Sequence, residues 1–123
     1  IVFNGGNELP GGVVSQSFNT VIGVEYEVTF DVGYYDYNVN NSGLLGIRAS
    51  VDNGAGTLLD TTFDVSNVVE VNPNFSAVGF SFIADSATTT LSFSDITEGD
   101  GTGNSAGGGA DIYFDNVTVV AVP

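Results

Sequence analysis

Strict alternation of apolar and polar side chains is the feature of this sequence that most restricts its fold. Between residues 24 and 34 every second side chain is apolar or aromatic, as in VEYEVTFDVGY. Successive side chains on a β-strand point to opposite faces, so the pattern predicts a long strand with one face toward a core. The predicted inward face carries Val24, Tyr26, Val28, Phe30, Val32 and Tyr34, and the outward face carries Glu25, Glu27, Thr29, Asp31, Gly33, Tyr35 and Tyr37.

The same alternation recurs along the whole chain between Gly- and Asn-rich segments, and no long stretch has helical spacing. The expected strands are 1–4, 13–18, 24–37, 44–51, 57–65, 75–84, 88–94 and 111–122. The segment DNGAG at 52–56 predicts a tight hairpin, and residues 97–110 predict a Gly-rich loop. About eight short strands predict one all-β domain over residues 1–123, built as a two-sheet antiparallel sandwich or jelly roll.

Composition excludes most catalytic chemistry. The chain has no Cys and no His, and Arg48 is its only basic residue. Zinc sites of the usual kind, Ser-His and Cys-His nucleophile pairs and Schiff bases are therefore excluded, and we expect no enzyme. The formal net charge of −14 predicts repulsion from nucleic acid and from anionic membranes, and it makes cations the natural partners. No apolar run reaches transmembrane length, so we expect no membrane contact by this segment.

Tyrosines and acids gather at the end of the long strand. Tyr35 and Tyr37 extend its outward row, and Asp31, Asp36 and Asn38 lie close to them in the sequence. Exposed rings beside carboxylates suit a sugar-binding face, because a ring stacks on the apolar face of a sugar while acids accept hydrogen bonds from hydroxyls. The alternative is that these rings cover a strand end or pack beneath the Asn-rich segment that follows.

One acid has an unexpected place in the alternation. Asp115, in YFDNVTV, has the parity of Val117 and Val119, which puts its carboxylate on the predicted inward face. A buried carboxylate without a partner costs several kcal/mol. Three solutions stay open: pairing with Arg48, binding of a metal ion, or a β-bulge that turns the side chain outward.

Three segments follow one another in a recognisable order and spacing: VFNGGNELPGGVVSQSFNTVIGVEYEVTFDVG, FSFIADSATTTLSFSD and DIYFDNVTVVAVP. In these, and over nearly its whole length, the chain resembles the β-sandwich domains of bacterial surface proteins that carry a C-terminal PEP-CTERM sorting signal. Those domains are similar to the galactose-binding-like jelly rolls, which include many carbohydrate-binding modules. The resemblance implies secretion by a Gram-negative-type bacterium, a place at the cell surface or in the extracellular matrix, and no catalysis.

The resemblance also implies a structural calcium ion. In the related carbohydrate-binding jelly rolls, an acid in the last-strand motif and an acid just after the first strand hold the ion. The matching residues are Asp115 and Glu8, with Asn7 as a further oxygen donor, although the family usually has an aromatic residue in place of Asn7. Calcium takes oxygen ligands, which an acidic chain without His or Cys can supply.

Two functions fit these observations. The first is a non-catalytic extracellular or cell-surface module, stabilised by calcium, that contacts polysaccharide or another matrix component. The second is a self-assembling structural subunit of an extracellular fibre or surface layer, because a chain without Lys leaves its strand edges poorly protected. In that case the short strand at 1–4 would pair across chains, and cations would have to screen the charge of −14.

Overall fold

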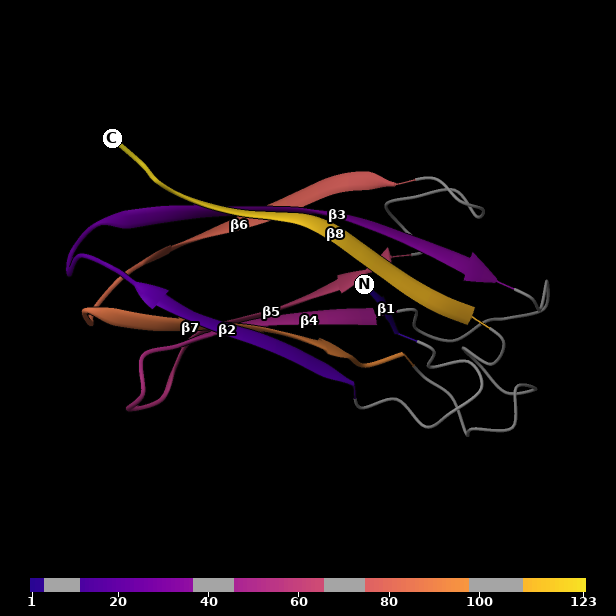
Figure 1. Cartoon of the computed structure of the whole chain (residues 1–123), viewed down its shortest axis with the longest axis horizontal. Helices are drawn as coiled ribbons and strands as arrows, with labels where there is room; N and C mark the ends of the chain where they lie inside the picture. The colour runs from indigo at the N-terminus through magenta and orange to yellow at the C-terminus, as the bar shows by residue number, and fades with distance from the viewer. Residues whose placement is uncertain (4–11, 37–45, 66–74, 98–109) are drawn as a thin grey trace.

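The computed structural model describes residues 1–3, 12–36, 46–65, 75–97 and 110–123. Within these residues, eight strands form two four-stranded antiparallel sheets that face each other (Figure 1). The first sheet has the order β1 (Val2–Phe3), β8 (Ala110–Ala121), β3 (Glu25–Asp36) and β6 (Ser76–Ile83). The second has the order β2 (Val13–Asn19), β7 (Thr88–Asp95), β4 (Gly46–Asp52) and β5 (Thr57–Asp64). The predicted all-β sandwich is confirmed, and each strand end lies within two residues of its expected position.

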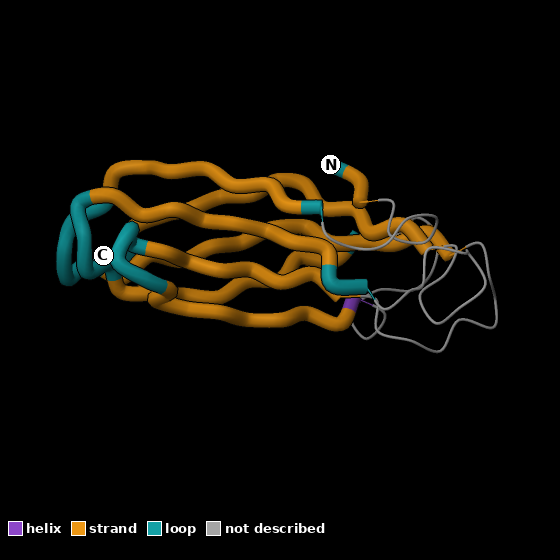
Figure 2. Tube along the Cα trace, turned by 90° about the horizontal axis from the view of Figure 1, so that it is seen from below, coloured by secondary structure: helices purple, strands orange, loops and turns teal. Residues whose placement is uncertain are grey.

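The strands run along the long axis of the molecule and are joined by short turns at one end (Figure 2). The predicted hairpin lies between β4 and β5. Its Asn53 side chain accepts hydrogen bonds at Oδ1 from the backbone N–H groups of Ala55 and Gly56, at 2.8 and 3.1 Å. Gly54 has a φ of 88°, a left-handed conformation that glycine adopts without strain. The Asn-Gly pair therefore has the role that the sequence predicted for it.

The core lies between the two sheets, and β3 contributes the face that alternation predicted. Val28, Phe30 and Val32 are buried, with at most 1% of their surface exposed. Tyr34 is partly buried and packs against this core, as expected for the inward row. Because the chain has no Cys, apolar packing rather than a disulfide holds the sheets together.

A β-bulge interrupts the pairing of β3 with β8. Thr29 pairs with Thr118, whereas Asp31 pairs with Asp115, so the register shifts between these two positions. Asn116 lies within the bulge and has a φ of 51°, a left-handed conformation that Asn tolerates better than most residues. The extra residue changes which side chains of β8 face the core.

The bulge overturns the prediction that Asp115 points inward. Its side chain is exposed, while Phe114 before it is buried and Val119 after the bulge packs against the core. Of the three solutions considered for this acid, the structure has the bulge. Arg48 is occupied elsewhere, because its Nε donates to Asp60 Oδ1 at 2.8 Å and the two side chains form an ion pair on the second sheet.

One glycine marks a close approach of β6 to β3. Gly79 is exposed, yet a Cβ at this position would lie 2.5 Å from the carbonyl oxygen of Val28. We expect Gly79→Ala to lower the free energy of unfolding by roughly 1–3 kcal/mol, since strand backbone would have to move. Urea denaturation measures this loss. Gly56→Ala is the control, because a Cβ there meets nothing within 4 Å, and an equal loss in both variants would contradict the prediction.

Candidate functional site

The structure describes one side chain of the five predicted to bind a ligand. Asp31 lies on the outer face of β3 and is partly exposed. Tyr35 and Asp36 form the end of the same strand, but their side chains lie outside the described part of the chain. Tyr37 and Asn38 lie outside the described residues. The ligand-binding role of these residues remains a prediction.

The predicted metal ligands are divided in the same way. Asn7 and Glu8 lie outside the described residues, whereas Asp115 is exposed on the outer face of the first sheet. Among the described residues, no group of three or more acidic, His or Cys side chains could hold a metal ion. The described part of the chain therefore supplies Asp115 and a neighbouring acid, Asp31, as oxygen donors.

The bulge places Asp31 and Asp115 side by side. They are direct partners across β3 and β8, and the Asn116 amide donates from Nδ2 to Asp31 Oδ2 at 2.7 Å. Like charges opposite each other on neighbouring strands are unfavourable, and the amide offsets part of that repulsion. One residue from each candidate site of the sequence, Asp31 for the ligand and Asp115 for the metal, thus lies on the same surface.

Two aromatic rings lie in the next row of this face. Tyr113 pairs with Gly33, and Phe75 comes immediately before Ser76, whose partner is Val32. The Phe75 and Tyr113 ring centroids are 6.3 Å apart with an interplanar angle of 53°. Phe75 is 51% exposed, whereas Gly33 is buried although it belongs to the outward row. The two rings therefore flank the glycine and form an aromatic surface across three strands.

These two rows, which we call the aromatic-acid face, are Phe75, Gly33 and Tyr113 in one and Asp31, Asp115 and Asn116 in the other. The rows are two residues apart along β3, or roughly 7 Å, which is close to the size of one sugar ring. An exposed ring offers an apolar contact, the carboxylates accept hydrogen bonds from hydroxyl groups, and the amide donates or accepts. Sequence alternation identified Asp31 but not Phe75, Tyr113 or Asn116.

Polar groups at the same end of the sandwich lack partners. Asp111, which pairs with Tyr35 through the backbone, has a fully buried Oδ1 without a hydrogen bond. The Thr97 hydroxyl is also buried and unpaired, while the Thr97 N–H donates to Asp95 Oδ1 at 2.9 Å. Burial raises the pKa of the Asp111 carboxyl, and the nearby Asp95 carboxylate raises that pKa further.

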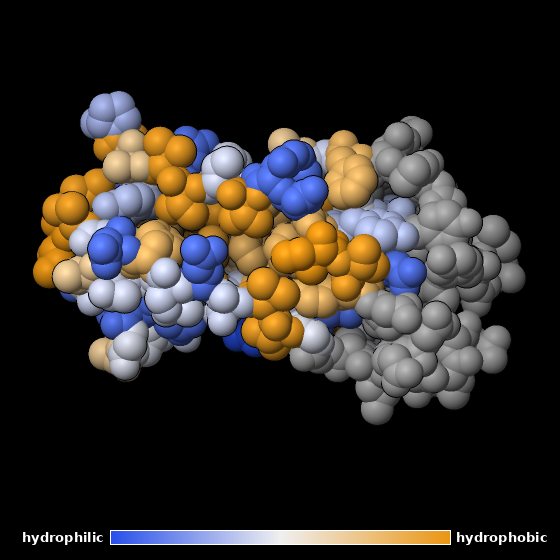
Figure 3. All heavy atoms as spheres, viewed as in Figure 1, coloured by the Kyte–Doolittle hydropathy of each residue, from blue (hydrophilic) through white to orange (hydrophobic). Residues whose placement is uncertain are grey.

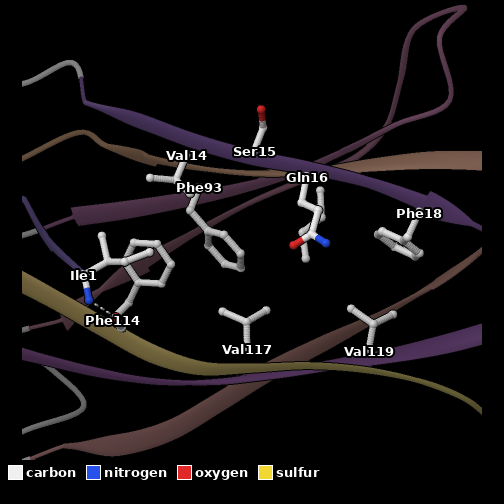
Figure 4. Close-up of a pocket in the computed structure, with 10 residues that line it drawn as sticks. Ile1, Val14, Ser15, Gln16, Phe18, Phe93, Phe114, Val117 and Val119 are labelled. Atoms are coloured by element: carbon white, nitrogen blue, oxygen red, sulfur yellow. Dashed lines mark hydrogen bonds between the residues drawn. The ribbon is translucent and has the colours of Figure 1, made fainter.

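A groove of about 450 Å³ opens on another side of the molecule, between β2 and β8 (Figure 4). It is lined by Ile1, Val14, Ser15, Gln16, Phe18, Leu91, Phe93, Phe114, Val117 and Val119. Ser15 and Gln16 are the polar side chains among these described residues, and Figure 4 shows the Gln16 amide between the two strands. A surface with so few hydrogen-bonding groups fits a sugar chain less well than the aromatic-acid face does.

The raised pKa of Asp111 gives a prediction for stability against pH. At neutral pH the carboxylate is charged in both states, but folding partly buries it, so it lowers stability. We expect Asp111→Asn to raise the melting temperature at pH 7. The gain should shrink as the pH falls through the raised folded-state pKa, and it should vanish below the ordinary value of 3.8.

Thermal denaturation of both proteins between pH 3 and 8 checks this expectation. Glu27→Gln is the control, because it removes an exposed carboxylate from the same sheet. A melting temperature for Asp111→Asn that is unchanged or lower at pH 7 would show that the carboxylate is stabilised in the folded protein.

No helix in the described part of the chain has the length and apolar character needed to cross a membrane. No family model matches the sequence, and no curated protein sequence matches it. The similar solved structures include a carbohydrate-binding module, CBM4, with a TM-score of 0.60 and 16% identity over 89% of this chain and 61% of that one. They also include the insecticidal delta-endotoxin Cry8Ea1 from Bacillus thuringiensis, with a TM-score of 0.54 and 22% identity over 100% of this chain and 19% of the toxin.

The chain thus spans less than two thirds of either protein. At these identities the likeness concerns the fold, because one sandwich architecture carries many unrelated functions. The comparisons show a two-sheet β-sandwich of the kind found in a carbohydrate-binding module.

Proposed function

We propose that this protein is a non-catalytic, extracellular module that binds polysaccharide through the aromatic-acid face. The observation that carries the proposal is the half-exposed Phe75 ring beside Tyr113, one row away from the Asp31–Asn116 hydrogen bond. An apolar ring beside fixed hydrogen-bonding groups is the combination that sugars require. The fold shared with CBM4 supports the same proposal.

The geometry suggests how a sugar chain would lie on this face. One sugar ring would stack on Phe75. Gly33 has no side chain, so it would leave room for the sugar between the two aromatic rings. The next hydrogen-bonding groups along β3 belong to Asp31, whose carboxylate the Asn116 amide already orients. A held carboxylate loses less side-chain freedom on binding than a free one, so it contributes more to affinity. Tyr35, the next outward position of β3 in the sequence pattern, would extend the surface.

The proposal includes no catalysis and no basic partner residue. Arg48, the single basic side chain of the sequence, pairs with Asp60 on the opposite sheet. Binding would therefore depend on ring stacking and on hydrogen bonds to acids and amides, and a neutral glycan would suit a face that carries several carboxylates better than an acidic glycan. Secretion and exposure at the surface of a Gram-negative-type bacterium remain part of the proposal through the sequence resemblance.

Calcium also remains part of the proposal. Asp31 and Asp115 offer carboxylate oxygens, the chemistry that calcium prefers, and a divalent cation would offset their mutual repulsion. Two carboxylates give fewer than the six to eight oxygens that calcium takes, so water or residues such as Asn7 and Glu8 would have to complete the site. A bound ion would supply positive charge to this face and stabilise the bulge.

Retention on polysaccharide tests the binding face. We expect affinity electrophoresis in gels that contain xylan, mixed-linkage glucan or galactomannan to retard the protein in at least one gel. Phe75→Ala should weaken that binding by roughly fivefold or more, because one stacking contact contributes about 1 kcal/mol. The control is Ile83→Ala, which removes a side chain of 62% exposure from the opposite end of β6. Equal weakening by both variants, or no retardation in any gel, would refute the proposed face.

Thermal denaturation with and without calcium tests the metal. A bound ion stabilises the folded state by about 2.7 kcal/mol when its free concentration is 100 times the dissociation constant. We expect millimolar calcium to raise the melting temperature of the wild type and to raise that of Asp115→Asn much less. Glu27→Gln, which removes another exposed acid of the same sheet, should keep the full calcium response. A full response in Asp115→Asn would remove Asp115 from the ligand set.

A further inference from the structure

One side chain joins the β4–β5 hairpin to the connection between β6 and β7. Asn53 of the hairpin donates from Nδ2 to Asp85 Oδ1 at 2.8 Å and to Asp85 Oδ2 at 2.7 Å, a contact that we call the amide clasp. Because β6 belongs to the first sheet and β7 to the second, the clasp ties the hairpin to a point where the chain crosses between the sheets. The hairpin projects from the lower left of the molecule, at the end of the sandwich opposite the start of β6 (Figure 1, Figure 3).

Gly54 makes this amide chemically vulnerable. Its backbone nitrogen is separated from Asn53 Cγ only by the Cβ, Cα and carbonyl carbon of Asn53, so its attack on Cγ closes a five-membered ring. Gly54 is exposed, and its N–H group makes no hydrogen bond to the described part of the chain. A Cβ on this residue would meet nothing within 4 Å, so water reaches the site and no side chain hinders the attack. Asn is among the thermolabile residues of proteins, and this pair gives it a suitable neighbour.

Deamidation at this pair is a substitution followed by a hydrolysis. The Gly54 nitrogen loses its proton to hydroxide and bonds to Asn53 Cγ, the Cγ–Nδ2 bond breaks, and ammonia leaves with a proton from water. Water then adds to either carbonyl of the resulting succinimide and opens the ring to an aspartate or an isoaspartate. The reaction needs no oxidant, no reductant and no reactant other than water, and it replaces a neutral amide by a carboxylate.

The clasp opposes this reaction in the folded protein. The Asp85 carboxylate lies 2.7 Å from the nitrogen that has to leave, and its negative charge disfavours the negative charge that the attack builds on the amide. The attack also makes Cγ tetrahedral, which moves Nδ2 out of the amide plane and away from the Asp85 oxygens. Hydrogen bonds to charged groups are among the stronger ones in proteins, so their loss adds to the barrier. Asp85 therefore protects Asn53 for as long as the clasp is closed.

We propose that Asn53 is a deamidation site restrained by Asp85, and that its conversion to a carboxylate opens the amide clasp. The product brings two carboxylates together at the place where an amide and a carboxylate attracted each other. No basic side chain relieves this repulsion, because Arg48, the single one in the sequence, pairs with Asp60. The modification thus releases the hairpin from the crossing between the sheets. It concerns the end of the sandwich away from the aromatic-acid face and does not depend on the proposed polysaccharide binding.

The deamidation rate at Asn53 tests the restraint. Peptide mapping by mass spectrometry measures this rate in folded protein that is incubated in isotopically labelled water at mildly alkaline pH. We expect Asp85→Ala to speed deamidation by roughly tenfold or more, whereas Glu27→Ala, which removes an exposed acid of the first sheet, should leave the rate unchanged. Thr20 still holds the β6–β7 connection through its N–H and Oγ1 groups, and near-ultraviolet circular dichroism shows that each variant is folded. Equal rates in the wild type and in Asp85→Ala would refute the restraint.

An exchange of the two residues tests the consequence. Asn53→Asp installs the product carboxylate, and we expect it to lower the melting temperature by several degrees, and by more at low salt because salt screens the repulsion. Adding Asp85→Asn restores an amide opposite a carboxylate, so the double variant should recover most of the loss. An Asn53→Asp protein as stable as the wild type, or a double variant no more stable than Asn53→Asp alone, would overturn the proposal.

Discussion

The packing of aromatic rings between the two sheets is the interaction on which the rest of this structure depends. Phe93 of the second sheet contacts both Phe30 and Phe114 of the first, with ring centroids 4.9 and 5.0 Å apart, and Phe63 meets Phe30 at 5.3 Å. Rings of this size bury much apolar surface, and a chain without disulfides has few other means to hold two sheets together. Phe30 of β3 and Phe114 of β8 thus join the two central strands of the first sheet to the same ring of the second.

That constraint explains how far the sequence could predict the fold. Alternation gave the strands and the inward row of β3, because a side chain must alternate to reach the core. It failed at Asp115, because parity counts residues and a bulge adds one. Phe114 and Val119 both face the core, and the extra residue of the bulge between them lies at Asn116. Asn tolerates the left-handed backbone that this position has. An Asp-Asn pair within an apolar alternation is the signal that can mark such a bulge.

The candidate site was harder to predict, for a different physical reason. Asp31 was found because it lies on the long strand itself, but the Phe75–Tyr113 contact joins residues far apart in the chain across Gly33. Such a row exists only after β6, β3 and β8 have paired in a defined register, and register between distant strands is not encoded in any one segment. Gly33 was the available clue: a glycine within a strand marks a place where neighbouring side chains close over the backbone.

The distribution of charge differs between the broad faces of the sandwich and the groove between β2 and β8. Acids lie on both broad faces, whereas β2 and the segment 116–121 of β8 carry no charged side chain. The bulge at Asn116 separates Asp115 from this uncharged segment of β8. One local irregularity therefore places Asp115 on the outer face of the first sheet while Val117 lines the groove, so the acidic character of that face and the apolar lining of the groove depend on the same residue.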